Sequence, residues 1–131
     1  MCFFKDFNSD GCTIDYEHQT CDHDIKCYKV LHQYDNGVLH SIPHHFPYEL
    51  GKTYEEKNVD LSLLDRLYEL NGYVFHSYTD ERYARSFRDT MVKKEGIVVV
   101  SCVIPAGTPF WRNDFHHEYA STKIRIDEIV E

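Results

Sequence analysis

One apolar run constrains the fold of this chain more than any other stretch. Residues 97–104 read I-V-V-V-S-C-V-I, eight residues that carry no charge and are mostly β-branched. A short run of this kind is typical of a strand that is covered on both faces. We therefore predict that it forms the centre of a β-sheet and that Cys102 is a small core residue within it. A Pro-Ala-Gly turn follows directly and ends the strand.

Several other segments predict strands that could pair with this run. Residues 25–31 and 73–78 alternate in the way that strands do. Asn36-Gly37 lies between two β-prone runs and favours a two-residue hairpin turn, because both residues tolerate positive φ. Residues 25–42 are expected to form a hairpin, and residues 43–54 a loop that ends in a short strand. Residues 108–111 are expected to form an extended edge, and residues 112–119 a polar loop. Residues 122–126 are expected to form a last strand, and residues 127–131 a tail.

A first helix is predicted over residues 60–70. Asp60 suits its N-cap, and Asn71-Gly72 supplies a left-handed stop. Four leucines form an apolar stripe at helical spacing, which is typical of a core face, namely Leu63, Leu64, Leu67 and Leu70.

A second helix is predicted over residues 80–92, with Thr79 able to cap it. Its buried side is expected to carry Ala84, Phe87 and Met91. Another face carries a row of arginines at i, i+3 and i+6. Such a row could hold a phosphate or carboxylate, but a solvated face balanced by nearby acidic residues is the favoured interpretation. The row consists of Arg82, Arg85 and Arg88.

These elements predict one α+β domain, a small, mostly antiparallel twisted sheet with two helices. The length of 131 residues suits a single domain. Residues 1–24 show little periodicity and are expected to form an irregular N-terminal segment, with the core in residues 25–131.

Charge and composition narrow the function classes. The formal net charge is −8 and no basic run is present, which argues against a duplex nucleic-acid binder. No apolar run approaches the roughly 18 residues of a membrane span, and the N-terminus does not read as a secretory signal. We therefore expect a cytoplasmic protein without a membrane partner, whose five cysteines are free thiols.

The N-terminal third also offers a possible zinc site. Its spacing is C-x8-C-x-H-x3-C, which supplies four ligands from Cys12, Cys21, His23 and Cys27. The paired C-x2-C knuckles that mark such sites are missing, so buried thiols and a surface histidine are favoured. We predict no cofactor, with zinc as the alternative.

Histidines elsewhere give a weaker metal alternative. Pro43 and Pro47 exclude the helix that would align the histidines between them. The candidate ligands are His40, His44, His45, His116 and His117.

The richest polar grouping lies after the apolar run. An aromatic plane beside cations and imidazoles suits a nucleotide-like ligand, because an aromatic ring stacks on a base and a cation takes a phosphate. A second cluster stands where the third strand meets the second helix, and the two could meet around one ligand. The candidate binding residues are Trp111, Arg112, His116, His117, Tyr119 and Lys123, with His76 and Tyr78 opposite. No phosphate-loop, dinucleotide-binding or nucleophile-elbow motif is present.

Five segments together resemble a loose group of small uncharacterised proteins of bacteriophages and gut bacteria. They read Y-K-V-L, Y-E-L-G-K-T-Y, G-Y-V-F-H-S-Y, C-V-I-P-A-G-T-P-F-W and Y-A-S-T-K-I-R-I, within residues 25–126. The resemblance implies expression in a bacterial cytoplasm and action on host defence, and it implies no settled activity.

A weaker likeness is to the ADP-ribosyltransferase fold, on the segments Y-K-V-L-H, F-H-S-Y-T and A-S-T-K-I-R-I. That family opens its late strand with a catalytic Glu, whereas Thr122 and Lys123 stand there in this chain. This departure favours a binder over a transferase.

The leading hypothesis is therefore a non-enzymatic protein that binds a nucleotide-like molecule and sequesters a host immune signal. The alternatives are an enzyme acting on NAD or a nucleotide, and an acidic inhibitor of a host protein.

Overall fold

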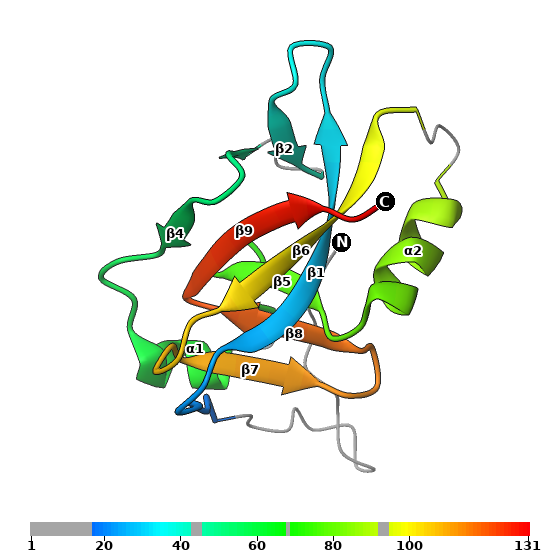
Figure 1. The fold of residues 1–131 in the computed structure, drawn as a ribbon. Helices are drawn as coiled ribbons and strands as arrows, with labels where there is room; N and C mark the ends of the chain where they lie inside the picture. Colours follow the sequence, from blue (N-terminus) through cyan, green and yellow to red (C-terminus); the bar gives the residue numbers. More distant parts are fainter. Residues whose placement is uncertain (1–16, 43–45, 68, 92–94) are drawn as a thin grey trace.

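The computed structural model describes residues 17–42, 46–67, 69–91 and 95–131, and in them it confirms an α+β architecture (Figure 1). The strands join in one sheet whose main path runs β4–β9–β6–β1–β5–β8–β7, with β2 and β3 attached beside β1. Each strand pairing is antiparallel. The elements are β1 (Ile25–Gln33), β2 (Leu39–Ser41), β3 (Pro47–Tyr48), β4 (Thr53–Glu55), α1 (Leu61–Arg66), β5 (Phe75–Tyr78), α2 (Glu81–Asp89), β6 (Ile97–Ile104), β7 (Phe110–Asn113), β8 (Glu118–Ser121) and β9 (Lys123–Ile129).

The apolar run forms β6 and lies inside the sheet, as predicted. β6 pairs with β1 without a break, from Ile25 opposite Ile104 to His32 opposite Ile97. Its other edge pairs with β9. Six of its eight residues are buried, and Cys102 is fully buried, as expected of a strand covered on both faces.

The predicted hairpin forms, but its turn is longer than two residues. The Tyr34 amide donates to the Val38 carbonyl at 3.0 Å, and the Gly37 amide donates to the Tyr34 carbonyl at 2.8 Å. Only Gly37 has positive φ, at 82°, so the prediction that both central residues adopt it is wrong. This geometry is a type I turn followed by a left-handed glycine.

The first helix is shorter than predicted. Asp60 caps it as expected and accepts a hydrogen bond from the Leu63 amide, but the helix ends at Arg66 because Leu67 is extended. The prediction of four core leucines is wrong for Leu63, which is 48% exposed. Leaving the helix lets the following chain turn inward, and Leu70 is fully buried.

The second helix begins where it was predicted but ends at Asp89, earlier than expected, and its cap is different. Asp80, not Thr79, is the N-cap, and its carboxylate accepts from the Arg82 amide at 2.8 Å. A carboxylate at this position also interacts favourably with the helix dipole. Ala84 is buried and Phe87 packs beside it, which confirms the predicted apolar side.

The segment expected to be an edge and a polar loop is a β-hairpin. β7 and β8 pair from Phe110 opposite Ser121 to Asn113 opposite Glu118, so only the four residues between the strands form the turn. The last strand is likewise longer than predicted, because β9 continues through Ile129 into the expected tail.

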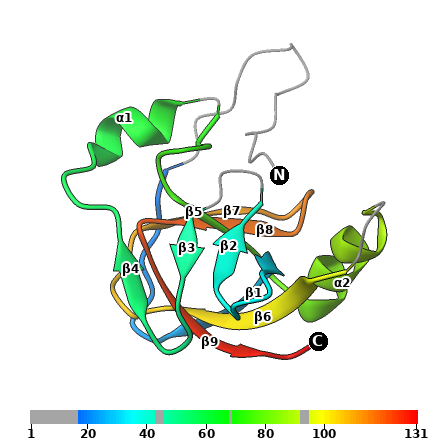
Figure 2. The same ribbon diagram turned by 90° about the horizontal axis from the view of Figure 1, so that it is seen from above.

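Buried side chains form three clusters. The largest lies among the strands and includes Leu31, Phe75 and Val100. A second contains Trp111 with leucines of and after α1, and a third lies beside α2. Seen from above, α1 and α2 stand well apart beside the sheet (Figure 2). The sheet therefore has two separate helical covers.

Candidate functional site: a pocket where two strands diverge

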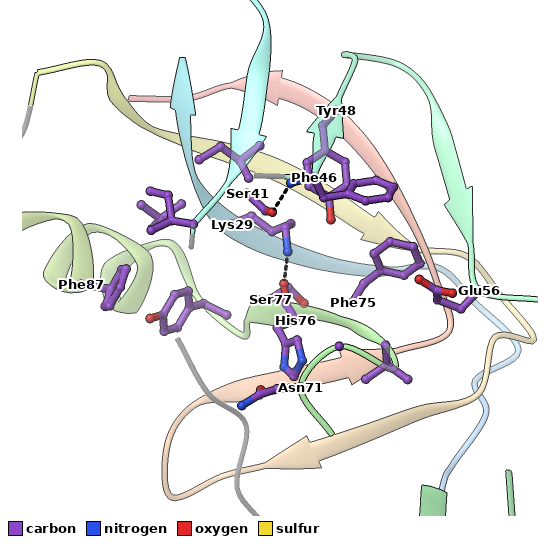
Figure 3. Close-up of a pocket in the computed structure, with 16 residues that line it drawn as sticks. Lys29, Ser41, Phe46, Tyr48, Glu56, Asn71, Phe75, His76, Ser77 and Phe87 are labelled. Atoms are coloured by element: carbon purple, nitrogen blue, oxygen red, sulfur yellow. Dashed lines mark hydrogen bonds between the residues drawn. The ribbon is translucent and has the colours of Figure 1, made fainter. Parts of the chain in front are cut away.

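The best-formed pocket lies where β1 and β5 separate. These strands are paired at a single position, Tyr28 opposite Tyr78. The residues just beyond that pair, Lys29 on β1 and Ser77 and His76 on β5, line a pocket of about 330 Å³ (Figure 3). An interrupted ladder thus supplies an opening within an otherwise continuous sheet.

The walls of this pocket are mainly aromatic and apolar, with a few polar groups. That composition is typical of small-molecule sites. The aromatic lining consists of Phe46, Tyr48, Phe75, Tyr78 and Phe87. The uncharged polar lining consists of Ser41, Asn71, His76 and Ser77, and Glu56 stands at its edge in Figure 3.

Lys29 is the buried basic side chain of this pocket. Only 9% of it is exposed, and its ammonium nitrogen Nζ donates to the backbone carbonyl of His76. Nζ also lies 5.5 Å from the centre of the Tyr48 ring. Among the described residues, no carboxylate forms an ion pair with it. The side chain therefore bridges the gap between the two strands without a neutralising partner.

Burial controls the protonation of the groups in this pocket. Desolvation lowers the pKa of Lys29, and the nearby thiols of Cys102 and Cys27 oppose this effect only in part. Desolvation also raises the pKa of the hydroxyls of Tyr48 and Tyr78, which keeps both phenols neutral. The pocket accordingly combines neutral hydrogen-bonding groups and one amine whose charge is costly, with the Glu56 carboxylate at its edge.

Trp111 does not provide the exposed aromatic plane that the sequence suggested. It is 1% exposed and packs against α1, and its indole Nε1 donates to the Asp65 carboxylate at 3.0 Å. Burial acts to raise the pKa of Asp65, but hydrogen bonds from His18 and Trp111 outweigh it and hold the pKa below its usual range. Trp111 is a core residue with a satisfied polar end.

The remaining residues of the predicted wall interact within or next to their own hairpin. Arg112 pairs with Asp114, and the ammonium group of Lys123 lies 3.5 Å from the Glu55 carboxylate. His117 stacks on Tyr83 of α2, with ring centres 3.7 Å apart and planes inclined by 3°. His116 is exposed in the turn, where it contacts Phe115, and Tyr119 is 7% exposed. None of these residues lines the pocket.

Strand pairing explains why this wall does not form. Residues directly opposite each other in neighbouring strands share a face of the sheet. His76, Ala120 and Trp111 stand opposite one another across β5, β8 and β7, and so do Ser77, Tyr119 and Arg112. Arg112 and Tyr119 therefore lie on the face away from Trp111. Of the predicted residues, the structure brings only His76 and Tyr78 into the pocket.

The proposed zinc ligands do not come together in the described residues. Cys27 is fully buried opposite Cys102 on β6, while His23 is exposed and contacts Asp22. No group of three possible ligands occurs in the part of the chain that the structure describes, which also leaves His40, His116 and His117 without a shared site. Cys12, His44 and His45 lie outside the described residues.

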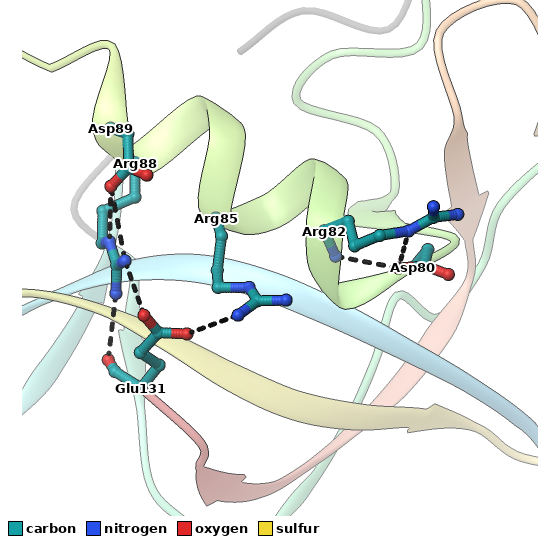
Figure 4. Close-up of polar contacts among 6 residues, drawn as sticks. All are labelled: Asp80, Arg82, Arg85, Arg88, Asp89 and Glu131. Carbon is teal, nitrogen blue, oxygen red and sulfur yellow. Dashed lines mark hydrogen bonds and ion pairs between the residues drawn. The ribbon is translucent and has the colours of Figure 1, made fainter.

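The arginine row on α2 is balanced by acidic side chains, as the sequence analysis favoured (Figure 4). Arg82 contacts Asp80 at 3.3 Å. Arg85 and Arg88 both reach the carboxylate of Glu131, at 3.4 and 2.9 Å. The row fastens α2 to the end of the chain rather than forming an open anion site.

Sequence reasoning missed Lys29 as a site residue, although a signal was present. Lys29 alternates with Ile25, Cys27 and Leu31 on one face of a strand that is otherwise apolar. A lysine at such a position is rarely buried without a reason. The other wall residues come from distant segments, and no local pattern marks them.

No family model, curated protein or solved structure matches the chain. Within the described residues, no helix has the length and apolar character needed to cross a membrane.

Proposed function

We propose that this protein binds a small, planar, anionic ligand of nucleotide type in the pocket around Lys29. The observation that carries the proposal is the buried amine of Lys29, which has no carboxylate partner among the described residues and faces an aromatic pocket. An anionic group on a ligand would supply the negative charge that pairs with the ammonium group of Lys29. Aromatic side chains such as Phe46 and Phe87 would contact its planar part.

The size of the pocket refines the ligand class. A volume of about 330 Å³ is at the lower end of the range for small-molecule sites. It favours one base with its sugar and phosphate over a dinucleotide such as NAD. The proposed site differs from the one expected around Arg112 and Lys123, because those cations already contact Asp114 and Glu55.

We further propose that binding itself is the function. The resemblance to bacteriophage proteins supports a role in sequestering a nucleotide signal of the bacterial host, in the cytoplasm. In this proposal, the chain acts as one domain with a twisted sheet, and the pocket is its working part.

Thermal-shift measurements with a panel of ligands test this proposal. AMP, GMP and cyclic mononucleotides are expected to raise the melting temperature by about 5–10 °C at a hundredfold excess over Kd, and NAD and ADP-ribose less. Lys29→Met should abolish the shift. Lys26→Met is the matched control, because Lys26 is exposed on the same strand. No shift with any mononucleotide at millimolar concentration, or an equal shift in Lys29→Met, would contradict the proposal.

A further inference from the structure

We propose that Lys29 is a nucleophilic amine that captures small aromatic aldehydes as an imine within its pocket. This inference rests on the proposed function in one respect, since the pocket must admit a planar, anionic molecule. It adds a covalent step and a substrate class, aryl aldehydes that carry an acidic group, to that site.

Geometry supports the inference first. The side chain of Lys29 is 9% exposed, and the residue lines a pocket of about 330 Å³. The hydrogen bond from its Nζ to the His76 carbonyl fixes the nitrogen at the gap between β1 and β5. A fixed nucleophile beside an open volume loses little further freedom when it reacts.

The surroundings of Lys29 also favour the reactive form of the amine. Only a neutral amine can attack a carbonyl carbon, and an ordinary lysine is almost entirely protonated at neutral pH. Burial lowers the pKa of Lys29, and no carboxylate among the described residues is close enough to reverse this effect. Tyr48 lies beside Nζ and remains a neutral phenol, because burial raises its pKa.

The reaction needs no oxidant, reductant or metal. The lone pair of Nζ forms a bond to the aldehyde carbon, the C=O π electrons move to oxygen, and one amine proton is transferred to that oxygen. The nitrogen lone pair of the resulting carbinolamine then forms the C=N bond. The hydroxyl group leaves as water after it receives a proton, and the nitrogen loses its second amine proton. The net change is amine plus aldehyde to imine plus water.

Pocket side chains can carry these protons. His76, Ser77 and Ser41 all line the volume into which the aldehyde oxygen would project. Imidazole and hydroxyl groups are ordinary relays for such transfers.

Reductive trapping tests the inference. The intact protein is mixed with 4-carboxybenzaldehyde and sodium cyanoborohydride at pH 7, and labelled lysines are identified by peptide mass mapping. Lys29 is expected to be labelled several-fold faster than Lys26, because burial lowers the pKa of Lys29 and leaves more of its amine neutral. Its labelling rate should also level off at lower pH than that of Lys26. Labelling of Lys29 no faster than that of Lys26 would overturn the inference.

Two controls separate this inference from the proposed function. The first is 4-(hydroxymethyl)benzoate, which has the shape and charge of the probe without its carbonyl group. If this alcohol binds at Lys29 but the aldehyde is not trapped there, the binding proposal stands and the imine is wrong. If the alcohol does not bind, the pocket itself fails as a ligand site. Lys29→Arg is the second control, because it keeps a cation and cannot form an imine, so it should lose the label.

Discussion

The β7–β8 hairpin and the Lys29 pocket are both rich in polar and aromatic side chains, yet they differ in how those groups are used. In the hairpin, Arg112 contacts Asp114, Trp111 contacts Asp65, and His117 stacks on Tyr83. In the pocket, Lys29 is buried with a backbone carbonyl as its hydrogen-bond acceptor.

This difference shows that a concentration of polar residues in sequence is a poor guide to a binding site. Neighbouring polar groups in a hairpin alternate between faces and find local partners, so little of their interaction energy is left for a ligand. A single cation on an apolar strand face has no such local partner on that face. Its burial is costly unless something else compensates for it.

The largest expected effect tests the structural role of the hairpin. Trp111→Ala should lower the free energy of unfolding by about 3–5 kcal/mol, because it empties a core site beside α1 and removes one of the hydrogen-bond donors to Asp65. Chemical denaturation measures this change. Arg112→Ala is the neighbouring control and should cost under about 1 kcal/mol, because its ion pair is exposed. A loss for Trp111→Ala no larger than that of the control would show that Trp111 is not a core residue.

Features that depend on local interactions could be predicted from the sequence, whereas features that depend on tertiary packing could not. The apolar run at β6, the capped start of α1 and the apolar side of α2 are local patterns, and the structure confirms them. The early end of α1 and the pairing of β7 with β8 depend on tertiary packing that no local pattern encodes. His76 and Tyr78 were predicted as binding residues from their place at a strand end, and both line the pocket.

The pocket as a whole could not have been predicted, because it requires the register of β1 against β5. That pair meets only at Tyr28 and Tyr78, and this fact appears nowhere in the sequence. The alternation of residues 25–31 places Lys29 on the same strand face as Cys27 and Leu31, but its burial follows from β5 and the segment around Phe46 and Tyr48 lying beside it.

A second prediction concerns a buried acid beside the turn of the β7–β8 hairpin. Glu118 is 5% exposed, and burial raises its pKa to about 7. Its folded pKa is therefore above its unfolded value, so its stabilising effect is complete below pH 4.5 and is lost as the pH rises through 7. We expect wild type to lose about 1–2 kcal/mol between pH 5 and 8, with a discount for solvent screening.

Glu118→Gln should make stability nearly independent of pH over that range, because the group can no longer ionise. Glu128→Gln, at an exposed position on β9, is the matched control and should behave as wild type. Denaturation curves at several pH values measure the effect. An equal loss in wild type and Glu118→Gln would show that the acid at the hairpin does not titrate as described.

A third prediction concerns the Lys29 pocket, where folding lowers a pKa instead of raising it. The pKa of Lys29 is lowered on folding, so the folded chain is penalised at pH values below its folded pKa. That penalty disappears as the pH rises through the ordinary lysine value, near 10.4. Lys29→Met removes the charge and should be more stable than wild type at pH 6, with a gap that narrows toward pH 10. A gap that widens with pH would contradict the described burial.

The smallest expected effect concerns the contact between hairpin and helix. His117→Ala removes a stacked ring from Tyr83 and should cost about 0.5–1.5 kcal/mol. Relief of the positive φ of His117, at 56°, would not offset this loss, because alanine is also strained there. Ligand binding should be unchanged in this variant, as measured by calorimetric titration. A large loss of affinity would show that the hairpin contributes to ligand binding.

Mapping ligand contacts by NMR tests the central claim most directly. Isotope-labelled wild-type protein is titrated with AMP and GMP, and amide shift changes are recorded along the chain. The account predicts the largest changes at Lys29, at Phe46 and Tyr48, and along β5, with the same titration silent in Lys29→Met. Changes confined to residues 112–119, with those of the pocket unaffected, would contradict it.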